Sequence, residues 1–321
     1  MNPRLLQWLV CPSCRASLRL QGGAAPAEIL EDELVCERGH RFPVTRGVPR
    51  FVHPAQLPRT AQRSRAAFGY EWSAFADYDV KNFHALVMPE PPQFFAGKLG
   101  LDVGCGAGRH LLAAAQAGAD MIGVDQSEAV DVAQSKIASL PRAHVMQADL
   151  QSLPLRHHTV DFLYSWGVLH HLAQPEAAFQ SLLPYLKPGG LIIVGLYHAS
   201  LRKRLLEWPR AVTTRLPLPL VHGIATCCAV VDYVGGILPY RLAARVVGPR
   251  LAQLAPAHLR EYAKYPFRVS EADWFDRLAA PITHWYTREE VARWFERAQL
   301  QEARVEPIGD FWWRGQGRLP C

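Results

Sequence analysis

The sequence is poor in several residue types that would indicate particular classes of protein. Seven cysteines in 321 residues are too few for a disulfide framework, and lysine accounts for only six of the 35 basic residues. Glycine and proline are dispersed without an internal period, which excludes a collagen-like or repeat protein. Because 49% of the residues are apolar and 20% are charged, predominant disorder is excluded and one large or two smaller cores are expected.

Long uninterrupted apolar runs are also lacking. The N-terminal run is broken at Gln7 and no small-residue cleavage site follows, so we expect no secretory leader and a cytoplasmic location. Residues 216–240 are apolar, but proline, glycine and Asp232 interrupt them. A spanning helix needs about 20 apolar residues, so the sequence predicts no transmembrane span.

Charge is distributed unevenly along the chain. Residues 99–198 carry five basic and eight acidic side chains, whereas 199–321 carry 18 and 12. The basic excess favours an anionic partner or surface, although a solvated basic face explains it equally well. Contact with a phosphate, or peripheral contact with a membrane through residues 201–268, therefore stays open, and the arginines concerned are Arg202, Arg204, Arg210, Arg215, Arg241, Arg245 and Arg250.

From Lys98 onward, short apolar segments alternate with helical ones. Strands are expected at 99–104, 120–125, 143–149, 160–166 and 191–197, with helices at 109–118, 127–140 and 175–186 and a turn at KPGG. A capping box of Thr287 and Glu290 opens a last helix at 287–300, and final strands follow around 303–308 and 311–315. The pattern predicts an α/β fold with a Rossmann-like, seven-stranded, mostly parallel sheet and helices on both faces.

Three units are expected along the chain. Residues 1–55 form a small zinc-ribbon-like domain, and 56–95 form a linker and helical cap. Residues 96–321 form the α/β domain, interrupted by a helical insert at about 199–283. Because the insert follows the fifth strand, it is expected to cover the carboxyl edge of the sheet as a lid over an acceptor pocket.

The sharpest motif is LDVGCGAGRH at 101–110, where a glycine loop follows the first strand. Its glycines allow a tight turn and a close approach of the backbone to a ligand. The dinucleotide-binding motif has Gly or Ala at the position of Arg109, so this loop departs from that motif. Asp125 ends the second strand, 21 residues after Gly104, where a carboxylate can bond ribose hydroxyls.

Six further motifs accompany the glycine loop: FGYEW at 68–72, IGVDQS at 122–127, QADLQSLPL at 147–155, VDFLYSWGVLHHL at 160–172, LKPGGLIIV at 186–194 and HWYTREEVARWFERAQL at 284–300. With these motifs in this order, the chain resembles the class I S-adenosylmethionine-dependent methyltransferases. The branch it is most similar to includes the ubiquinone- and menaquinone-biosynthesis enzymes. The resemblance implies that Asp102, Gly104, Gly106 and Gly108 hold the methionine moiety of the cofactor and that Asp125, with Gln126 beside it, contacts the ribose. It also implies that Asp149 and Leu150 contact the adenine and that Trp166 lies near the sulfonium.

Methyl transfer mainly requires alignment of acceptor and methyl group and exclusion of water. A general base is needed only if the acceptor must lose a proton. The pair His170–His171 suggests a base or a metal pair, but a structural role in its loop is favoured. The other weak candidates near the acceptor are Tyr70, Tyr164, His198, His284 and Tyr286.

A second constellation lies at the N-terminus: Cys11 and Cys14, then Cys36 and His40 after 21 intervening residues. Two close pairs of N/S ligands suit tetrahedral structural zinc, which a unit of this size needs; a redox pair and a ribbon without metal are the alternatives. LVCPSC, LVCERGHRFPV and GVPRF resemble the zinc ribbons related to the small activator subunit of tRNA and protein methyltransferases. His40 stands one residue later than the usual cysteine, as in the ribbon of bacterial ribosomal-RNA guanine methyltransferases.

Three functions follow as hypotheses. The first is an S-adenosylmethionine-dependent enzyme that methylates a small, hydrophobic or phosphorylated molecule under the insert. The second is a ribosomal- or transfer-RNA methyltransferase that binds RNA through its ribbon and insert, although no stacking platform stands out. The third is a non-catalytic, cofactor-binding partner protein.

Overall fold

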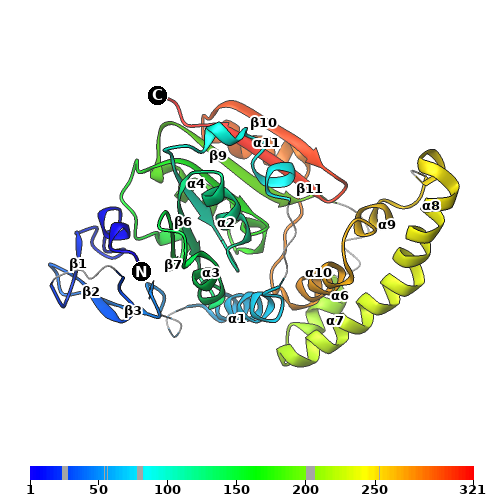
Figure 1. Ribbon diagram of the computed structural model, residues 1–321, viewed down its shortest axis with the longest axis horizontal. Helices are drawn as coiled ribbons and strands as arrows, with labels where there is room; N and C mark the ends of the chain where they lie inside the picture. Colours follow the sequence, from blue (N-terminus) through cyan, green and yellow to red (C-terminus); the bar gives the residue numbers. More distant parts are fainter. Residues whose placement is uncertain (24–27, 54, 56, 78–81, 200–206, 253) are drawn as a thin grey trace.

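The centre of the molecule is one mixed β-sheet (Figure 1), seen in a computed structural model that describes the chain except residues 24–27, 54, 56, 78–81, 200–206 and 253. Its strands are β5 (Leu99–Val103), β6 (Asp120–Asp125), β7 (Ala143–Gln147), β8 (Val160–Trp166), β9 (Leu186–Tyr197), β10 (Gln301–Ile308) and β11 (Trp312–Arg318). Their order is β10–β11–β9–β8–β5–β6–β7, with antiparallel pairing only at β9–β11 and β10–β11. The predicted Rossmann-like, seven-stranded, mostly parallel sheet is confirmed.

Helices cover both faces of this sheet, with α4 (Pro175–Leu182) and α11 (Arg288–Arg297) on one face and α2 (Arg109–Gln116) and α3 (Ala129–Ile137) on the other. The other described α-helices are α1 (Arg59–Ala74), α6 (Glu207–Thr213), α7 (Leu218–Asp232), α8 (Leu238–Ala252), α9 (Ala257–Tyr262) and α10 (Phe267–Ala279). Successive strand residues point to opposite faces of the sheet and so contribute to two hydrophobic cores, one on each face. Leu101 belongs to the core formed with α4 and α11, and Phe162 belongs to the core formed with α2 and α3. The capping box of Thr287 and Glu290 is present at the start of α11.

One predicted turn is part of a strand. KPGG lies inside β9, whose pairing with β11 reaches Leu191 and whose pairing with β8 reaches back to Leu186. Gly189 has a φ of 73°, and its N–H donates to the carbonyl of Leu319 at 2.9 Å. The glycine therefore bends the strand without ending it, because a neighbouring segment still accepts its hydrogen bond.

The N-terminal unit packs directly on the sheet. Its strands are β1 (Leu18–Leu20), β2 (Asp32–Cys36), β3 (Arg41–Thr45) and β4 (Val48–Pro49), in that order. Val10 donates its N–H to the carbonyl of Pro154 at 2.9 Å, and Phe51 donates its N–H to the carbonyl of Gln147 at 2.8 Å. Leu5 and Leu9 are fully buried in the core that also contains Leu101. The ribbon and the sheet therefore share one hydrophobic core.

The insert contains one long helix rather than broken pieces. α7 continues through the π-helical turn η8 (Tyr233–Ile237) into α8 (Figure 1). Glycine and proline interrupt the apolar run of the sequence but not the helix, because the wider π turn holds Gly235 and Gly236 and adjusts the hydrogen bonding just before Pro239. Among the described residues, Leu218–Val246 is long and apolar enough to cross a membrane, judged by length and composition alone.

Candidate active site and metal centre

A cavity of about 830 Å³ opens at the carboxyl ends of the parallel strands. One end lies against the glycine loop and the ends of β6 and β8, and the other lies between α1, α10 and the end of β9. Six of the nine predicted cofactor residues line it: Gly104, Asp125, Gln126, Asp149, Leu150 and Trp166. Asp102, Gly106 and Gly108 are not among the lining residues, so the cavity gathers most of the predicted set.

The glycine loop depends on its three glycines. Gly104, Gly106 and Gly108 have φ values of 79°, 50° and 78°, in the left-handed region. A Cβ on Gly104 would lie 2.2 Å from Val168 Cγ2, and one on Gly106 would lie 2.9 Å from Nε1 of Trp72. Any side chain here would therefore both strain the backbone and collide with the cavity wall.

Asp125 links the second strand to this loop. Its Oδ2 accepts a hydrogen bond from the N–H of Gly106 at 2.9 Å, and its Oδ1 accepts from the N–H and hydroxyl of Ser127 at 2.8 and 2.6 Å. Burial raises the pKa of Asp125, and these donors oppose the rise. A carboxylate offers about four acceptor positions, so one remains for a ligand hydroxyl.

Asp102 lies beneath the loop rather than in the cavity. It is buried and accepts a hydrogen bond from the Tyr164 hydroxyl at 3.2 Å. Burial raises its pKa to about 8, although the Tyr164 hydroxyl lowers it. A protonated Asp102 can donate a hydrogen bond, and its place under the glycine loop suits support of that backbone.

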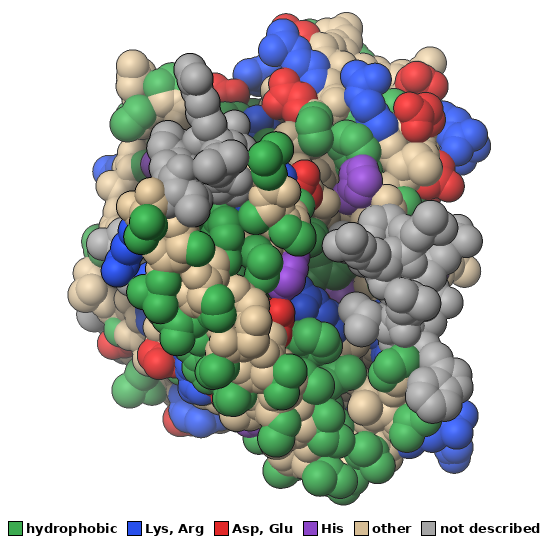
Figure 2. All heavy atoms as spheres, turned by 90° about the vertical axis from the view of Figure 1, so that its right-hand side faces the viewer, with side chains coloured by type: hydrophobic (Ala, Val, Ile, Leu, Met, Phe, Trp, Pro, Cys, Tyr) green, Lys and Arg blue, Asp and Glu red, His purple; other side chains and the backbone are tan. Residues whose placement is uncertain are grey.

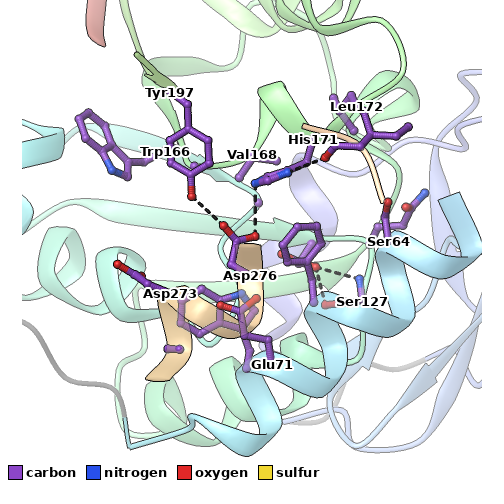
Figure 3. Close-up of a pocket in the computed structure, with 18 of the residues that line it drawn as sticks. Ser64, Glu71, Ser127, Trp166, Val168, His171, Leu172, Tyr197, Asp273 and Asp276 are labelled. Carbon is purple, nitrogen blue, oxygen red and sulfur yellow. Dashed lines mark hydrogen bonds and ion pairs between the residues drawn. The ribbon is translucent and has the colours of Figure 1, made fainter. Parts of the chain in front are cut away.

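The other end of the cavity is rich in carboxyl groups. Glu71 on α1 and Asp273 and Asp276 on α10 point into the same space (Figure 3). Burial, then Asp276 and Asp273, raise the pKa of Glu71 well above its ordinary value. The Tyr197 hydroxyl donates to Oδ2 of Asp276 at 2.7 Å.

His171 faces Asp276 across this end (Figure 3). Its Nδ1 lies 2.8 Å from the carbonyl oxygen of Ile282, a geometry that places the proton on Nδ1. Its Nε2 lies 3.6 Å from Oδ1 of Asp276. Burial lowers the pKa of His171, although Asp276 opposes this effect. Burial therefore favours the neutral imidazole, and with the proton on Nδ1 the Nε2 atom faces the acidic cluster.

Of the histidines and tyrosines considered from sequence, His171 lines this cavity, and the others lie outside its lining. Tyr70 bonds Nδ1 of His222 at 3.1 Å, and His170 is fully buried with its ring 4.0 Å from that of Tyr197. His284 bonds the carbonyl of Leu172 at 3.1 Å through Nε2, and the ring of Tyr286 packs against Trp294. Tyr164 and His198 are also absent from the lining.

Sequence reasoning missed Glu71, Asp273, Asp276 and Tyr197, which line the cavity. It considered His171 as one of the histidine pair but favoured a structural role, and His171 lines the same cavity. Glu71 in FGYEW and the two aspartates of α10 carried none, because only the tertiary fold brings these helices together.

The predicted zinc ligands come together in the ribbon. The ligand atoms of Cys11, Cys14, Cys36 and His40 all lie within 4.8 Å of one another. Sγ of Cys14 is 3.7 Å from Sγ of Cys36, and Nδ1 of His40 is 3.3 Å from the latter sulfur. A tetrahedron with Zn–S bonds of about 2.3 Å has edges of about 3.8 Å, so the cluster fits structural zinc. Four protein ligands leave no open position for catalysis at the metal.

Two family models match this chain. Residues 101–194 match a model described as "Methyltransferase domain", and residues 2–47 match one described as "Trm112p-like protein". The first match contains the glycine loop, Asp125 and His171, and the second contains the four zinc ligands.

Curated relatives match mainly the methyltransferase segment. The tRNA U34 carboxymethyltransferase of Idiomarina loihiensis is 32% identical over 31% of this chain and 32% of its own length. The ubiquinone biosynthesis O-methyltransferase of Haemophilus ducreyi is 32% identical over 34% of this chain and 50% of its own. The chain thus spans between a third and half of these relatives. A crystal structure of a SAM-dependent methyltransferase from Aquifex aeolicus covers 77% of this chain and 97% of that one, at 17% identity and a TM-score of 0.44.

Proposed function

We propose that this chain, which carries a class I S-adenosylmethionine-dependent methyltransferase domain behind a Trm112p-like segment, methylates a small, largely apolar molecule. The acceptor would carry a weakly acidic hydroxyl or a related group that loses a proton as it is methylated. It would bind between α1, α10 and the end of β9, next to the cofactor residues.

The continuous cavity carries this proposal. Gly104, Asp125 and Trp166 lie at one end and His171 and Asp276 at the other, all on the lining of the same space. A small molecule and the cofactor can therefore meet inside the protein, away from bulk water. The aromatic side chains that share the lining, Phe68, Tyr197, Tyr262, Tyr265, Phe311 and Trp312 among them, suit a flat apolar acceptor.

The chain's own residues would position the acceptor and take its proton. S-adenosylmethionine, when bound, supplies the methyl group. Nε2 of His171 can accept the acceptor's proton, because Nδ1 is committed to the carbonyl of Ile282. The Asp276 carboxylate, held by the Tyr197 hydroxyl, would stabilise the imidazolium that forms. Glu71 and Asp273 add negative charge or hydrogen-bond donors according to their protonation.

RNA is the second candidate acceptor, and a specific observation favours it. Relatives of the methyltransferase segment include proteins named as tRNA U34 carboxymethyltransferases. In this chain, however, the ribbon packs its apolar residues into the shared core. An RNA substrate would have to reach His171, a buried side chain.

A label-partition assay tests the proposal. The purified chain is incubated with methyl-labelled S-adenosylmethionine and cell extract, and label is followed into solvent-extractable, nuclease-sensitive and protease-sensitive fractions. We expect label in the solvent-extractable fraction. Nuclease-sensitive label would overturn the small-molecule proposal in favour of RNA, and cofactor binding without labelling of any fraction would indicate a non-catalytic partner protein.

A further inference from the structure

The long helix of the insert has one face packed on the protein. Val221 and Ala225 of α7 are fully buried in the cluster that contains Phe275 of α10, and Ala229 is fully buried on the same helix. Thr226 donates its hydroxyl to Glu271 of α10 at 2.8 Å. This face is therefore already occupied, and α7 is held beside the helix that forms one wall of the cavity.

The opposite face carries exposed apolar side chains, here called the valine stripe. It consists of Leu220, Val230, Val231, Val234, Leu238, Leu242 and Val246, of which Val231 is 73% and Val246 is 86% exposed. From Val231 onward its members recur every three or four residues, so they follow one side of the helix. The stripe is about 39 Å long at 1.5 Å per residue. Figure 2 shows hydrophobic side chains gathered over this part of the surface.

The charges beside the stripe have one sign. Arg215, just before α7, and Arg245 are exposed, and Arg241 is half-buried with a hydrogen bond from Nη1 to the Tyr233 hydroxyl. The acidic residue of the helix, Asp232, is half-buried and bonds Nε2 of His258 at 2.8 Å. Among the described residues of α7, η8 and α8, no exposed carboxylate is present. Arg202 and Arg204, also expected to contribute, and the side chain of Arg250 lie outside the described residues.

We propose that the valine stripe binds the surface of an anionic lipid membrane, with its apolar side chains inserted below the headgroups and the arginines paired with lipid phosphates. Apolar side chains on one face with arginines beside them are the features of a helix that lies in a membrane interface. A second copy of the chain would offer these arginines no carboxylates from its own stripe. The inference does not depend on which acceptor is methylated.

The helix would lie on the membrane rather than cross it. A crossing helix exposes all its sides to lipid, which would separate Val221, Ala225 and Ala229 from α10 and leave Glu271 without Thr226. Figure 1 shows α8 running along the outer edge of the molecule, away from the sheet, where a flat surface can reach it.

Vesicle flotation tests the proposal with the full chain. Vesicles of phosphatidylcholine with phosphatidylglycerol are compared with vesicles of phosphatidylcholine alone. We expect the wild-type chain to float with the anionic vesicles, and the double variant Val231→Asp/Val234→Asp to bind them at least about tenfold more weakly. Both residues are exposed, so thermal melting should be unchanged. Leu30→Asp, on the ribbon and 57% exposed in the wild type, is the matched control and should float like the wild type.

Arg245→Glu separates charge from insertion. It should weaken binding to the anionic vesicles and leave the weaker binding to neutral vesicles unchanged. The proposal is overturned if the wild type does not float, or if the double variant floats as well as the wild type. A dimer measured by light scattering that the double variant dissociates, without flotation of the wild type, would assign the stripe to a second copy.

Discussion

The two ends of the cavity are built differently. The cofactor end takes Gly104, Asp125 and Trp166 from the ends of three strands that are neighbours in the sheet, inside the segment that matches the methyltransferase family. The acceptor end takes Glu71 from α1 before that segment and Asp276 from α10 after it, with His171 from within. Substitutions of Glu71 and Asp276 should therefore change the proposed acceptor end and leave the cofactor residues in place, so changes at the two ends should have separable effects.

The largest separation is expected at the acceptor end. His171→Ala removes the proposed proton acceptor and should lower kcat about 10²- to 10⁴-fold. Cofactor affinity should stay within about twofold, because His171 bonds the carbonyl of Ile282 rather than the glycine loop. Single-turnover kinetics and calorimetry with S-adenosylmethionine measure the two effects, with His157→Ala, an exposed histidine outside the cavity, as control. Equal losses of kcat and affinity would contradict the division.

Gly104→Ala tests the cofactor end through its backbone. The residue's φ of 79° and the 2.2 Å approach of a Cβ to Val168 should destabilise the fold by about 2–4 kcal/mol and distort the loop. Thermal melting and cofactor titration provide the measurements. Gly97→Ala has a similar φ of 71° but no atom within 4 Å of its Cβ, so it isolates the backbone strain from the collision.

Asp125→Ala should weaken cofactor binding by about 1–3 kcal/mol. The change removes the acceptor of the Gly106 and Ser127 hydrogen bonds as well as the proposed ribose contact. Asp125→Asn keeps an oxygen and should lose less. Calorimetry with wild-type affinity in Asp125→Ala would show that the ribose is held elsewhere.

Tyr197→Phe should have a smaller effect, a loss of about tenfold or less in kcat, since it deletes one hydrogen bond to Asp276. The loss should appear at saturating cofactor, and the KM for the cofactor should not change. A purely structural role would instead lower the melting temperature without a specific change in kcat.

The kcat/KM should depend on pH only below neutrality. Burial holds the pKa of His171 below its ordinary value of about 6.5, so the base is neutral at pH 7. The kcat/KM should be flat above neutral pH and fall only as the pH drops through that lowered value, when His171 becomes protonated. A profile that already declines below pH 8 would assign the proton transfer to another group.

More of the residues predicted for the cofactor than of those predicted for the acceptor line the cavity, for a physical reason. Asp125 follows Gly104 within one strand–helix–strand unit, so its position is set by local periodicity. The capping box of Thr287 and Glu290 was equally local and is present. His171 and Asp276 meet only because the insert returns to the sheet, and no local pattern specifies that return.

The continuity of the long helix could not be predicted from the sequence for a related reason. Gly235, Gly236 and Pro239 are usually helix breakers, yet the π turn adjusts the hydrogen bonding around them while buried Ile237 holds it against Tyr262. Breaker residues indicate what an isolated helix would do, and tertiary packing decided otherwise. The N-terminal ligands were predictable because their spacing alone specifies a tetrahedral cluster.

The placement of the ribbon beside β7 has a consequence for solubility. β7 is the last strand of the sheet, and its neighbour on the open side is the segment at Arg50 and Phe51, which bonds Gln147. An uncovered edge strand such as AHVMQ offers its backbone to other chains and promotes aggregation. The ribbon therefore covers the edge of the sheet and prevents pairing between copies of the chain. Loss of the ribbon's metal should be seen first as precipitation of the protein.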